Sequence, residues 1–205
     1  MSPKKRISLR DRVVREVCFW NIFALDSRPL FIQAPLPSQA QGLANINNQT
    51  SDLQAHLREQ LTFWRSDIGV GKLIFSQVKK KQQLERIWAD ETLWTEVHQA
   101  LVRLLRHQGA IDMLISQSSL RWKLGRMGNV DRAVLRLGTY ELCFHEDLPA
   151  RALLNEAVEL GKRYGSTESG RFINGVLDRI AQELARINKR AESSGVSVSV
   201  VHRKR

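Results

Sequence analysis

An all-α fold of about seven helices is predicted by the sequence. Apolar residues recur every three or four positions over most of the chain, which is the spacing of one face of a helix. The alternation typical of a half-buried strand occurs only in VSVSVV at 196–201, which is short and terminal. With 205 residues and a hydrophobic content of 42%, the chain can bury one sizeable core, and we predict a single domain over residues 1–190.

The first predicted helix covers residues 8–25. Its apolar side chains form one line, which consists of Leu9, Val13, Val17 and Trp20. Prolines and polar residues then fill about 26–51, a composition typical of a flexible insertion. At the other end, residues 191–205 are rich in Ser and Val and finish in HRKR, which predicts a disordered basic tail.

Helical spacing returns at about Asp52 and continues to residue 118. One helix begins there, two more are predicted over 70–88 and 90–107, and IDMLISQS forms a short fourth. Asp90 is expected to be an N-cap, because an Asp side chain accepts hydrogen bonds from the first free backbone N–H groups of a helix.

The segment NVDRAVLRLGTYELCFH at 129–145 is apolar on most sides. Such a helix is usually central in its domain, and Asn129 is its predicted N-cap. Pro149 suits the first turn of the following helix, and Gly165 is expected to end it. Ser166 or Thr167 is then expected to cap the last helix.

Asn174-Gly175 is a turn signal inside the apolar stripe of that last helix. A glycine inside a helix costs about 1 kcal/mol relative to alanine, and it is tolerated where another helix approaches closely. We therefore predict that Gly175 packs against the preceding helix near Gly161, with Asn174 hydrogen-bonded at the seam. A binding role for Asn174 is the alternative.

The formal net charge of +11 and the pI of about 10.3 point to a polyanionic partner. Nucleic acid is the first choice, an anionic membrane surface the second, and a merely solubilising surface the third. No segment reaches the roughly 20 apolar residues of a membrane span. Cys18 and Cys143 sit in apolar helical patterns, which favours two buried thiols and a reducing cytoplasm over a disulfide framework.

The candidate catalytic and metal-binding motifs in the sequence each lack residues that their chemistry requires. GVGK at 69–72 would need glycine at Ser66 and a hydroxyl residue at Leu73 to be a phosphate-binding loop. The five histidines show no metal-ligand spacing, and Glu159 has Lys162 and Arg163 within helical reach, which favours ion pairing over acid–base catalysis. We expect neither an enzyme nor a bound cofactor.

Three motifs resemble the NusB family of transcription antitermination factors. They are NVDRAVLRLGTYEL, LPARALLNEAVELGKRYG and STESGRFINGVLDRI, and the resemblance is gap-free over about residues 129–185. It extends through IDMLI and RWKLGRM and through the first helix as far as Trp20, whereas residues 27–107 match poorly. The resemblance implies two packed helical bundles. It also implies a protein that joins the small-subunit ribosomal protein NusE and binds boxA-type RNA in nascent rRNA leaders within the transcription elongation complex.

The family's arginine-rich motif precedes and enters the first helix. Alignment on Trp20 places two of its arginines at Arg6 and Arg10, while Ile7 and Ser8 stand at two others and Cys18 replaces a frequent tyrosine. The predicted RNA-binding residues are Lys4, Lys5, Arg6, Arg10 and Arg12, with Lys79, Lys80 and Lys81 as a second basic patch. That second patch could equally be an ordinary solvated face.

The resemblance also implies a partner face. Asp131 at the start of one helix and Glu168 before the last helix are the predicted partner-binding residues, since an acidic surface suits a basic ribosomal protein. Each could instead only stabilise a helix N-terminus. Two other functions remain open. One is a regulatory RNA-binding domain of the kind found in rRNA methyltransferases, which would need a catalytic domain that does not follow residue 185, and the other is a helical dimerisation module.

Overall fold

The computed structural model describes residues 7–27, 57–63, 65–66, 81–120, 122–145 and 148–193. All regular structure within these ranges is helical, which confirms the predicted fold class. No helix in the described part of the chain is long and apolar enough to cross a membrane.

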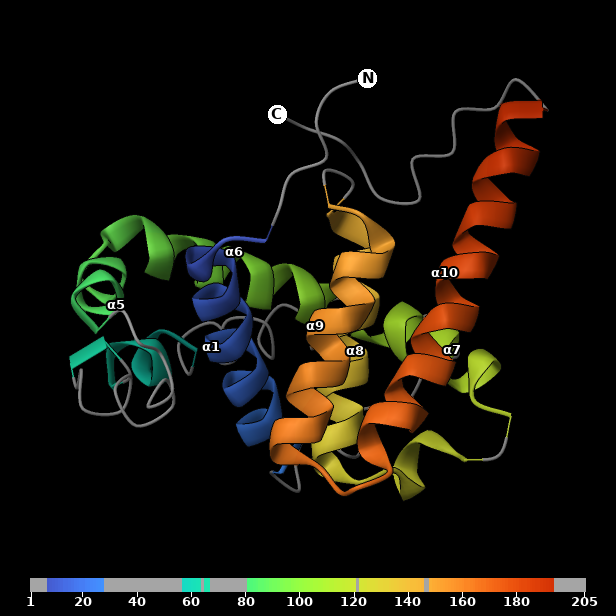
Figure 1. The fold of residues 1–205 in the computed structure, drawn as a ribbon, viewed down its shortest axis with the longest axis horizontal. Helices are drawn as coiled ribbons and strands as arrows, with labels where there is room; N and C mark the ends of the chain where they lie inside the picture. The colour runs from blue at the N-terminus through green and yellow to red at the C-terminus, as the bar shows by residue number, and fades with distance from the viewer. Residues whose placement is uncertain are drawn as a thin grey trace, which may run out of the picture.

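The helices follow one another along the chain as shown in Figure 1. They are α1 (Leu9–Asp26), α5 (Lys81–Trp88), α6 (Glu91–Arg106), α7 (Gln108–Ser118), α8 (Asn129–Phe144), α9 (Ala150–Tyr164) and α10 (Ser169–Ser193), with a short 3-10 helix, η1 (Leu124–Arg126), between α7 and α8. Residues 57–63 and 65–66 are also helical. The predicted helices at 8–25, 90–107 and 129–145 are therefore confirmed to within about two residues.

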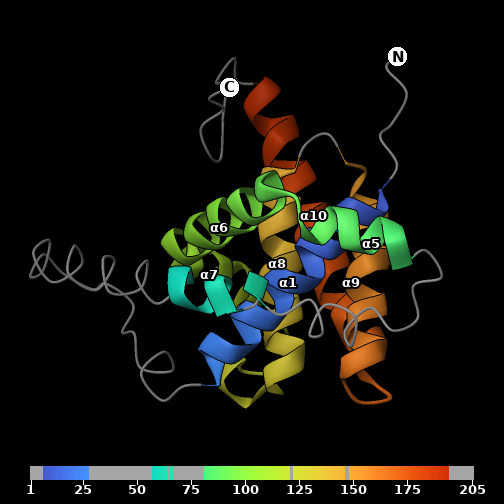
Figure 2. The ribbon, with the colours of Figure 1, turned by 90° about the vertical axis from the view of Figure 1, so that its left-hand side faces the viewer.

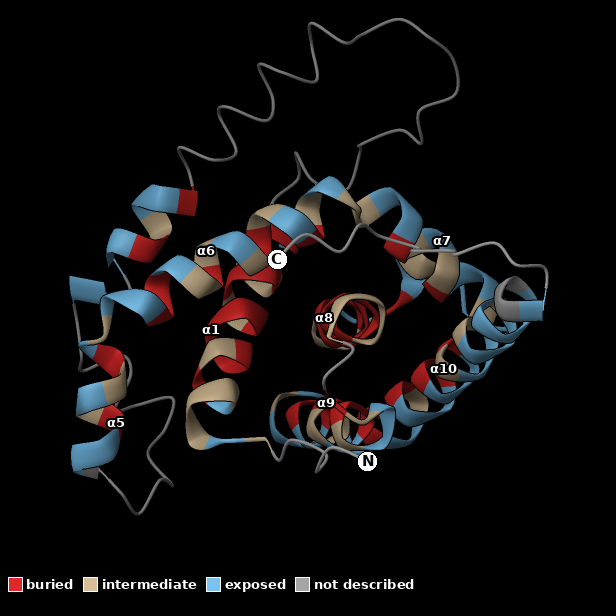
Figure 3. Ribbon diagram, turned by 90° about the horizontal axis from the view of Figure 1, so that it is seen from above, coloured by how far each residue is buried: buried red, intermediate tan, exposed pale blue. Residues whose placement is uncertain are grey.

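Helix α8 is the centre of the fold. Every residue from Arg132 to Glu141 is buried, as the continuous apolar character of the segment predicts. Seen from above, α1, α6, α7, α10 and α9 surround α8 (Figure 3). Helices α7, α8, α9 and α10 pack with one another, and α1, which runs across α8 in Figure 2, packs with both α8 and α6. Two bundles thus share one central helix.

Two element boundaries differ from the sequence prediction. Helix α1 extends through Asp26, which is buried, so the predicted insertion cannot begin at 26, and residues 28–51 lie outside the described residues. Helix α10 extends through Ser193, so residues 191–193 are helical and not part of a disordered tail. The remainder of that tail, 194–205, lies outside the described residues.

The helix caps are decided by local hydrogen bonds. Asp90 caps α6 as predicted, because its side chain accepts from the backbone N–H of Thr92. Asn129 is not the cap of α8: Gly128 takes that place, and the Asn129 amide nitrogen lies 3.4 Å from the hydroxyl oxygen of Ser27. Neither Ser166 nor Thr167 caps α10 through its side chain. Instead the hydroxyl of Ser169, its first residue, accepts from the backbone N–H of Ser166 at 2.8 Å.

The sequence predicts that Gly161 and Gly175 both lie where α9 and α10 approach closely. This is confirmed for Gly161 and wrong for Gly175. A Cβ at Gly161 would lie 2.3 Å from the Cδ1 atom of the buried Ile173, so this glycine does permit close approach of the two helices. Gly175 and Asn174, in contrast, are exposed, and nothing lies within 4 Å of a Cβ built at Gly175. The error arises because Gly175 is next to the apolar stripe in sequence but turns away from α9.

We predict opposite outcomes for the same substitution at these two glycines. Gly161→Leu should lower the free energy of unfolding by about 1–3 kcal/mol or more, because the larger side chain overpacks the seam against Ile173. Gly175→Leu should leave stability unchanged or raise it by up to about 1 kcal/mol, through helix propensity. Chemical denaturation of both variants tests this, and equal destabilisation of the two would contradict the assigned seam.

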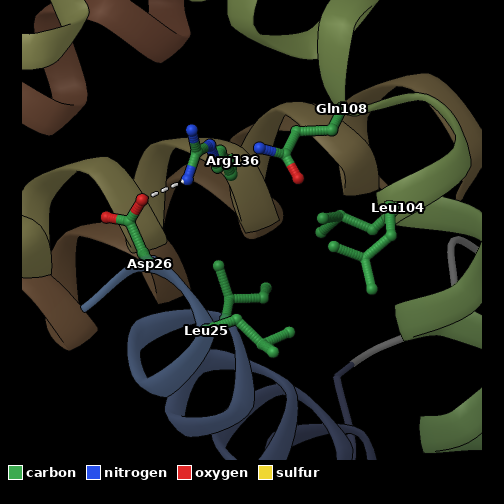
Figure 4. Close-up of a pocket in the computed structure, with 7 residues that line it drawn as sticks. Leu25, Asp26, Leu104, Gln108 and Arg136 are labelled. Carbon is green, nitrogen blue, oxygen red and sulfur yellow. Dashed lines mark hydrogen bonds and ion pairs between the residues drawn. The ribbon is translucent and has the colours of Figure 1, made fainter. Parts of the chain in front are cut away.

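A buried ion-pair network ties three helices together. Asp26, the last residue of α1, accepts hydrogen bonds at 2.6 Å from Arg132 Nε and from Arg136 Nη1 of α8. Arg136 also donates to both carboxylate oxygens of Asp112 in α7, at 2.7 and 2.9 Å. Figure 4 shows the Asp26–Arg136 pair beside the apolar side chains of Leu25 and Leu104. Loss of Asp26 would remove the carboxylate that pairs with the buried Arg132 and leave Arg136 with Asp112.

We predict that Asp26→Asn lowers the free energy of unfolding by about 3–5 kcal/mol, the usual cost of breaking a buried pair by removing one partner. The matched control is Asp178→Asn, because Asp178 is exposed on α10 and accepts only from the amide of Gln182 at 2.7 Å. Urea unfolding at neutral pH measures both. A loss for Asp26→Asn no greater than that of the control would show that the network contributes little.

Candidate RNA and partner interfaces

A capping box fixes the residue at which α1 begins. The Ser8 hydroxyl accepts from the backbone N–H of Asp11 at 3.1 Å, and the Asp11 carboxylate accepts from the backbone N–H of Ser8 at 2.7 Å. A serine at this position is therefore explained by helix initiation, although it replaces an arginine of the family pattern. Lys4, Lys5 and Arg6 lie outside the described residues.

Arg10 and Arg12, the two predicted RNA-binding arginines within α1, are both held by carboxylates. Arg10 donates to Glu96 of α6 and, at 3.0 Å, to the Thr92 hydroxyl. Arg12 donates to both oxygens of Glu156 of α9, at 2.9–3.1 Å, although its own side chain stays 56% exposed. The charges of these arginines are thus already compensated within the protein, which the sequence did not reveal.

The second predicted basic patch cannot be placed on the described surface. Lys79 and Lys80 lie outside the described residues, and Lys81 is the first residue of α5, with a side chain that is likewise outside them.

The middle of α1 carries two buried charged residues, Arg15 and Glu16, in addition to its apolar line. Arg15 Nε donates to Glu141 of α8 at 2.7 Å, and both side chains are buried. Glu16 accepts from Arg163 at 2.9 Å and from the Tyr164 hydroxyl of α9. Burial is the largest influence on both glutamates and raises the pKa of each carboxyl, while the facing arginines lower it. These pairs position α1 against α8 and α9.

The predicted partner residues lie at the other end of the molecule. Asp131 is half-buried in the first turn of α8, and Glu168 is exposed just before α10, 3.6 Å from Arg171. Helices α1 and α8 are antiparallel, so the start of α8 lies beside the end of α1 (Figure 1). An 18-residue helix is about 27 Å long, and this length separates the acidic end from the N-terminal end of α1.

Two large apolar side chains are exposed in the segment between α7 and η1. Leu120 is 76% and Trp122 is 54% exposed. The segment is nevertheless fixed, since the Ser119 hydroxyl donates to the Trp122 carbonyl at 2.9 Å and Arg179 of α10 donates to the Ser118 carbonyl at 2.9 Å. Arg132 of α8 also donates to the Met127 carbonyl at 3.0 Å, which ties the following residues to the start of α8. Sequence patterns could not single out these residues, because an apolar residue between helices is usually buried.

The geometry described so far is that of a helical binding protein with arginines at one end and an acidic, partly apolar surface at the other. The model of the NusB family matches residues 66–182. "Transcription antitermination protein NusB" of Desulfitobacterium hafniense is 42% identical over 117 residues, which cover 55% of this chain and 77% of that protein. The Bacillus subtilis protein of the same name is 38% identical over 109 residues, 53% of this chain and 83% of that protein. The chain therefore belongs to the NusB family.

A solved structure supports the fold over a longer stretch. A chain of the structure described as "Crystal Structure of Antitermination Factors NusB and NusE in complex with dsRNA" aligns with a TM-score of 0.51 and 20% identity, covering 85% of this chain and 97% of that chain. At this identity the likeness concerns the fold alone. Helix α1 lies outside the range that the family model matches, but it packs against the matched helices as part of the same core.

Proposed function

We propose that this protein is a cytoplasmic, RNA-binding transcription antitermination factor that acts by binding and not by catalysis. Its proposed partners are a boxA-like element in nascent rRNA leaders, the ribosomal protein NusE and the transcription elongation complex. The observation that carries this proposal is the family membership, with relatives named transcription antitermination proteins at 42% and 38% identity. The net charge of +11 supports RNA as a ligand.

The RNA surface is proposed at the N-terminal end of α1. Lys4, Lys5 and Arg6 stand directly before the capping box and can follow a phosphate backbone, with Lys79 to Lys81 as the second basic candidate. Arg10 and Arg12 contribute if RNA phosphates replace the carboxylates that hold them. That exchange is most accessible to Arg12, whose side chain is more exposed than that of Arg10.

The NusE surface is proposed at the opposite end, around Asp131 and Glu168, with Leu120 and Trp122 as its apolar part. Protein interfaces combine a buried aromatic or apolar centre with a charged rim, and acidic side chains complement a basic ribosomal protein. Because about the length of α1 separates the two surfaces, RNA and NusE can bind at the same time without competing for the same residues.

The direct test of this function uses the purified full chain, purified NusE and fluorescent RNA. We expect binding of boxA-like leader RNA that becomes tighter when NusE is added, and weaker binding of a scrambled RNA. A chain that forms a stable dimer by light scattering, yet binds neither RNA nor NusE, would be a dimerisation module and would overturn the proposal.

We predict that the salt dependence of RNA binding reports the phosphate contacts of Arg6, Arg10 and Arg12. Removing three phosphate contacts with Arg6→Ala, Arg10→Ala and Arg12→Ala should weaken binding and reduce the slope of log affinity against log salt concentration by about two, at about 0.7 per contact with single-stranded RNA. Glu156→Gln, which frees Arg12, should strengthen binding. Arg171→Ala, at the far end, is the control. An unchanged slope in a folded triple variant would place the RNA site elsewhere, with the Lys79–Lys81 patch the next candidate.

We predict that Trp122→Ala weakens NusE binding about tenfold or more and leaves thermal stability nearly unchanged, because the side chain is exposed in the free protein but would be a central contact in the complex. Phe63→Ala is the matched control, since Phe63 is a 64% exposed aromatic residue outside the proposed surface. Isothermal titration with purified NusE gives the affinities. Equal affinities for wild type and Trp122→Ala would remove this residue from the interface.

A further inference from the structure

A cleft of about 200 Å³ opens between α1, α6 and α8. The residues that shape it include Arg15 and Cys18 of α1, Ala100 of α6, and Tyr140, Glu141 and Phe144 of α8. Gln99 and Arg103 line it as well and are exposed, so the cleft is open to solvent beside α6. None of the interactions proposed above uses it.

Two buried polar side chains in this cleft are incompletely hydrogen-bonded. The side chains of Arg15 and Glu141 are only 5% and 8% exposed and pair through Arg15 Nε. Within the described structure, Arg15 Nη1 and Glu141 Oε2 find no hydrogen-bond partner, and Arg15 Nη1 lies 3.6 Å from a carboxylate oxygen of Glu156. A buried polar group without a partner costs about 1–3 kcal/mol, so a ligand that offers one donor and one acceptor would be favoured here.

The charges around the cleft select a neutral ligand. Asp11 and Glu96 line it together with Glu141, and three carboxylates would repel a phosphate or another anion. Arg15 and Arg103 oppose a cation in the same way, and the described residues contain no group of three or more acidic, His or Cys side chains placed to hold a metal ion.

The wall of the cleft suits a flat ring. Tyr140 and Phe144 are stacked, with ring centroids 4.9 Å apart, and the Arg103 guanidinium lies 5.6 Å from the centroid of Phe144. Val14, Leu137 and Leu148 add apolar side chains to the lining, which also includes the imidazole of His145. Aromatic rings and a guanidinium plane are the groups on which proteins stack unpaired bases of RNA.

We propose that this cleft receives one unpaired nucleobase of the bound RNA and reads its Watson–Crick edge. A base N–H donates to Glu141 Oε2, and an adjacent carbonyl oxygen or ring nitrogen accepts from Arg15 Nη1. Both protein atoms lie beneath the surface of the cleft, so the Arg15–Glu141 pair turns slightly toward the base as it enters. The proposal rests on the RNA-binding function proposed above and adds where a base is recognised.

The position of the cleft fits an RNA strand held at α1. Asp11 and Val14, which line it, follow Arg10 in the same helix, so a strand whose phosphates meet the N-terminal end of α1 passes its opening. A base in a duplex has its Watson–Crick edge occupied, and the cleft therefore selects single-stranded RNA.

The test measures the affinity of the full chain for a 12-nucleotide, single-stranded, boxA-like RNA and for versions with one abasic nucleotide at each position in turn. For wild type, one abasic position should weaken binding about tenfold or more, well beyond the others. In Ala100→Phe the larger side chain fills the cleft. This variant should bind the intact RNA as weakly as wild type binds the RNA that is abasic at the sensitive position. Its affinity should not change further when that position is made abasic. Ala110→Phe, at an exposed position of α7, should behave as wild type.

A second variant protects the test against a folding defect. Glu141→Gln keeps the side-chain shape but can present an amide N–H where the base needs an acceptor, so it should lose sensitivity at the same RNA position. Glu183→Gln, at an exposed position of α10, is its control, and circular dichroism checks folding. If wild type binds RNA but no position stands out, or if folded Ala100→Phe keeps the full abasic effect, the base site is wrong and the proposed function stands. If wild type binds no RNA, both fail.

Discussion

The packing of the helices in this protein depends on the buried ion pairs that the carboxylate of Asp26 forms. This carboxylate receives Arg132 and Arg136 of the central helix α8, and Arg136 in turn holds Asp112 of α7. Arg132 also fixes the carbonyl of Met127 at the start of α8. One carboxylate at the end of α1 thus links α1 to α8 directly and to α7 through Arg136. Because charges without partners are costly in a core, alternative packings of these helices are disfavoured.

The same pairing makes α1 and α8 antiparallel, and this has a functional consequence. Arg10 lies at one end of α1, whereas the first turn of α8, with Asp131, lies beside the other end. The length of α1, about 27 Å, separates these two ends. The proposed complex with RNA and NusE uses this separation, since each ligand meets its own surface. The cleft beside Glu141 lies along the N-terminal half of α1, from Asp11 to Cys18.

The net charge of +11 does not translate directly into a basic surface. Arg15, Arg132 and Arg136 are buried in ion pairs, and Arg10 and Arg12 are paired with Glu96 and Glu156. These arginines form ion pairs between helices, so their charges are already partly neutralised within the protein. RNA contacts within α1 therefore compete with internal carboxylates, whereas the arm before Ser8 carries Lys4, Lys5 and Arg6 ahead of the helix. We therefore expect Lys4, Lys5 and Arg6 to contribute more to phosphate binding than Arg10 and Arg12.

The sequence by itself determined the helical fold, the central place of α8, the cap at Asp90 and the family, because each rests on local spacing or on a contiguous motif. It misjudged Gly175 and Asn129, whose neighbours in space are not those that the pattern suggested. Only the tertiary structure decided the partners of Arg10 and Arg12, which are 86 and 144 residues away along the chain, the exposure of Trp122, and the cleft at Glu141. The reason is physical: helix formation depends on residues within a turn of one another, whereas ion pairs and clefts depend on which helix faces are brought together by packing of the whole core.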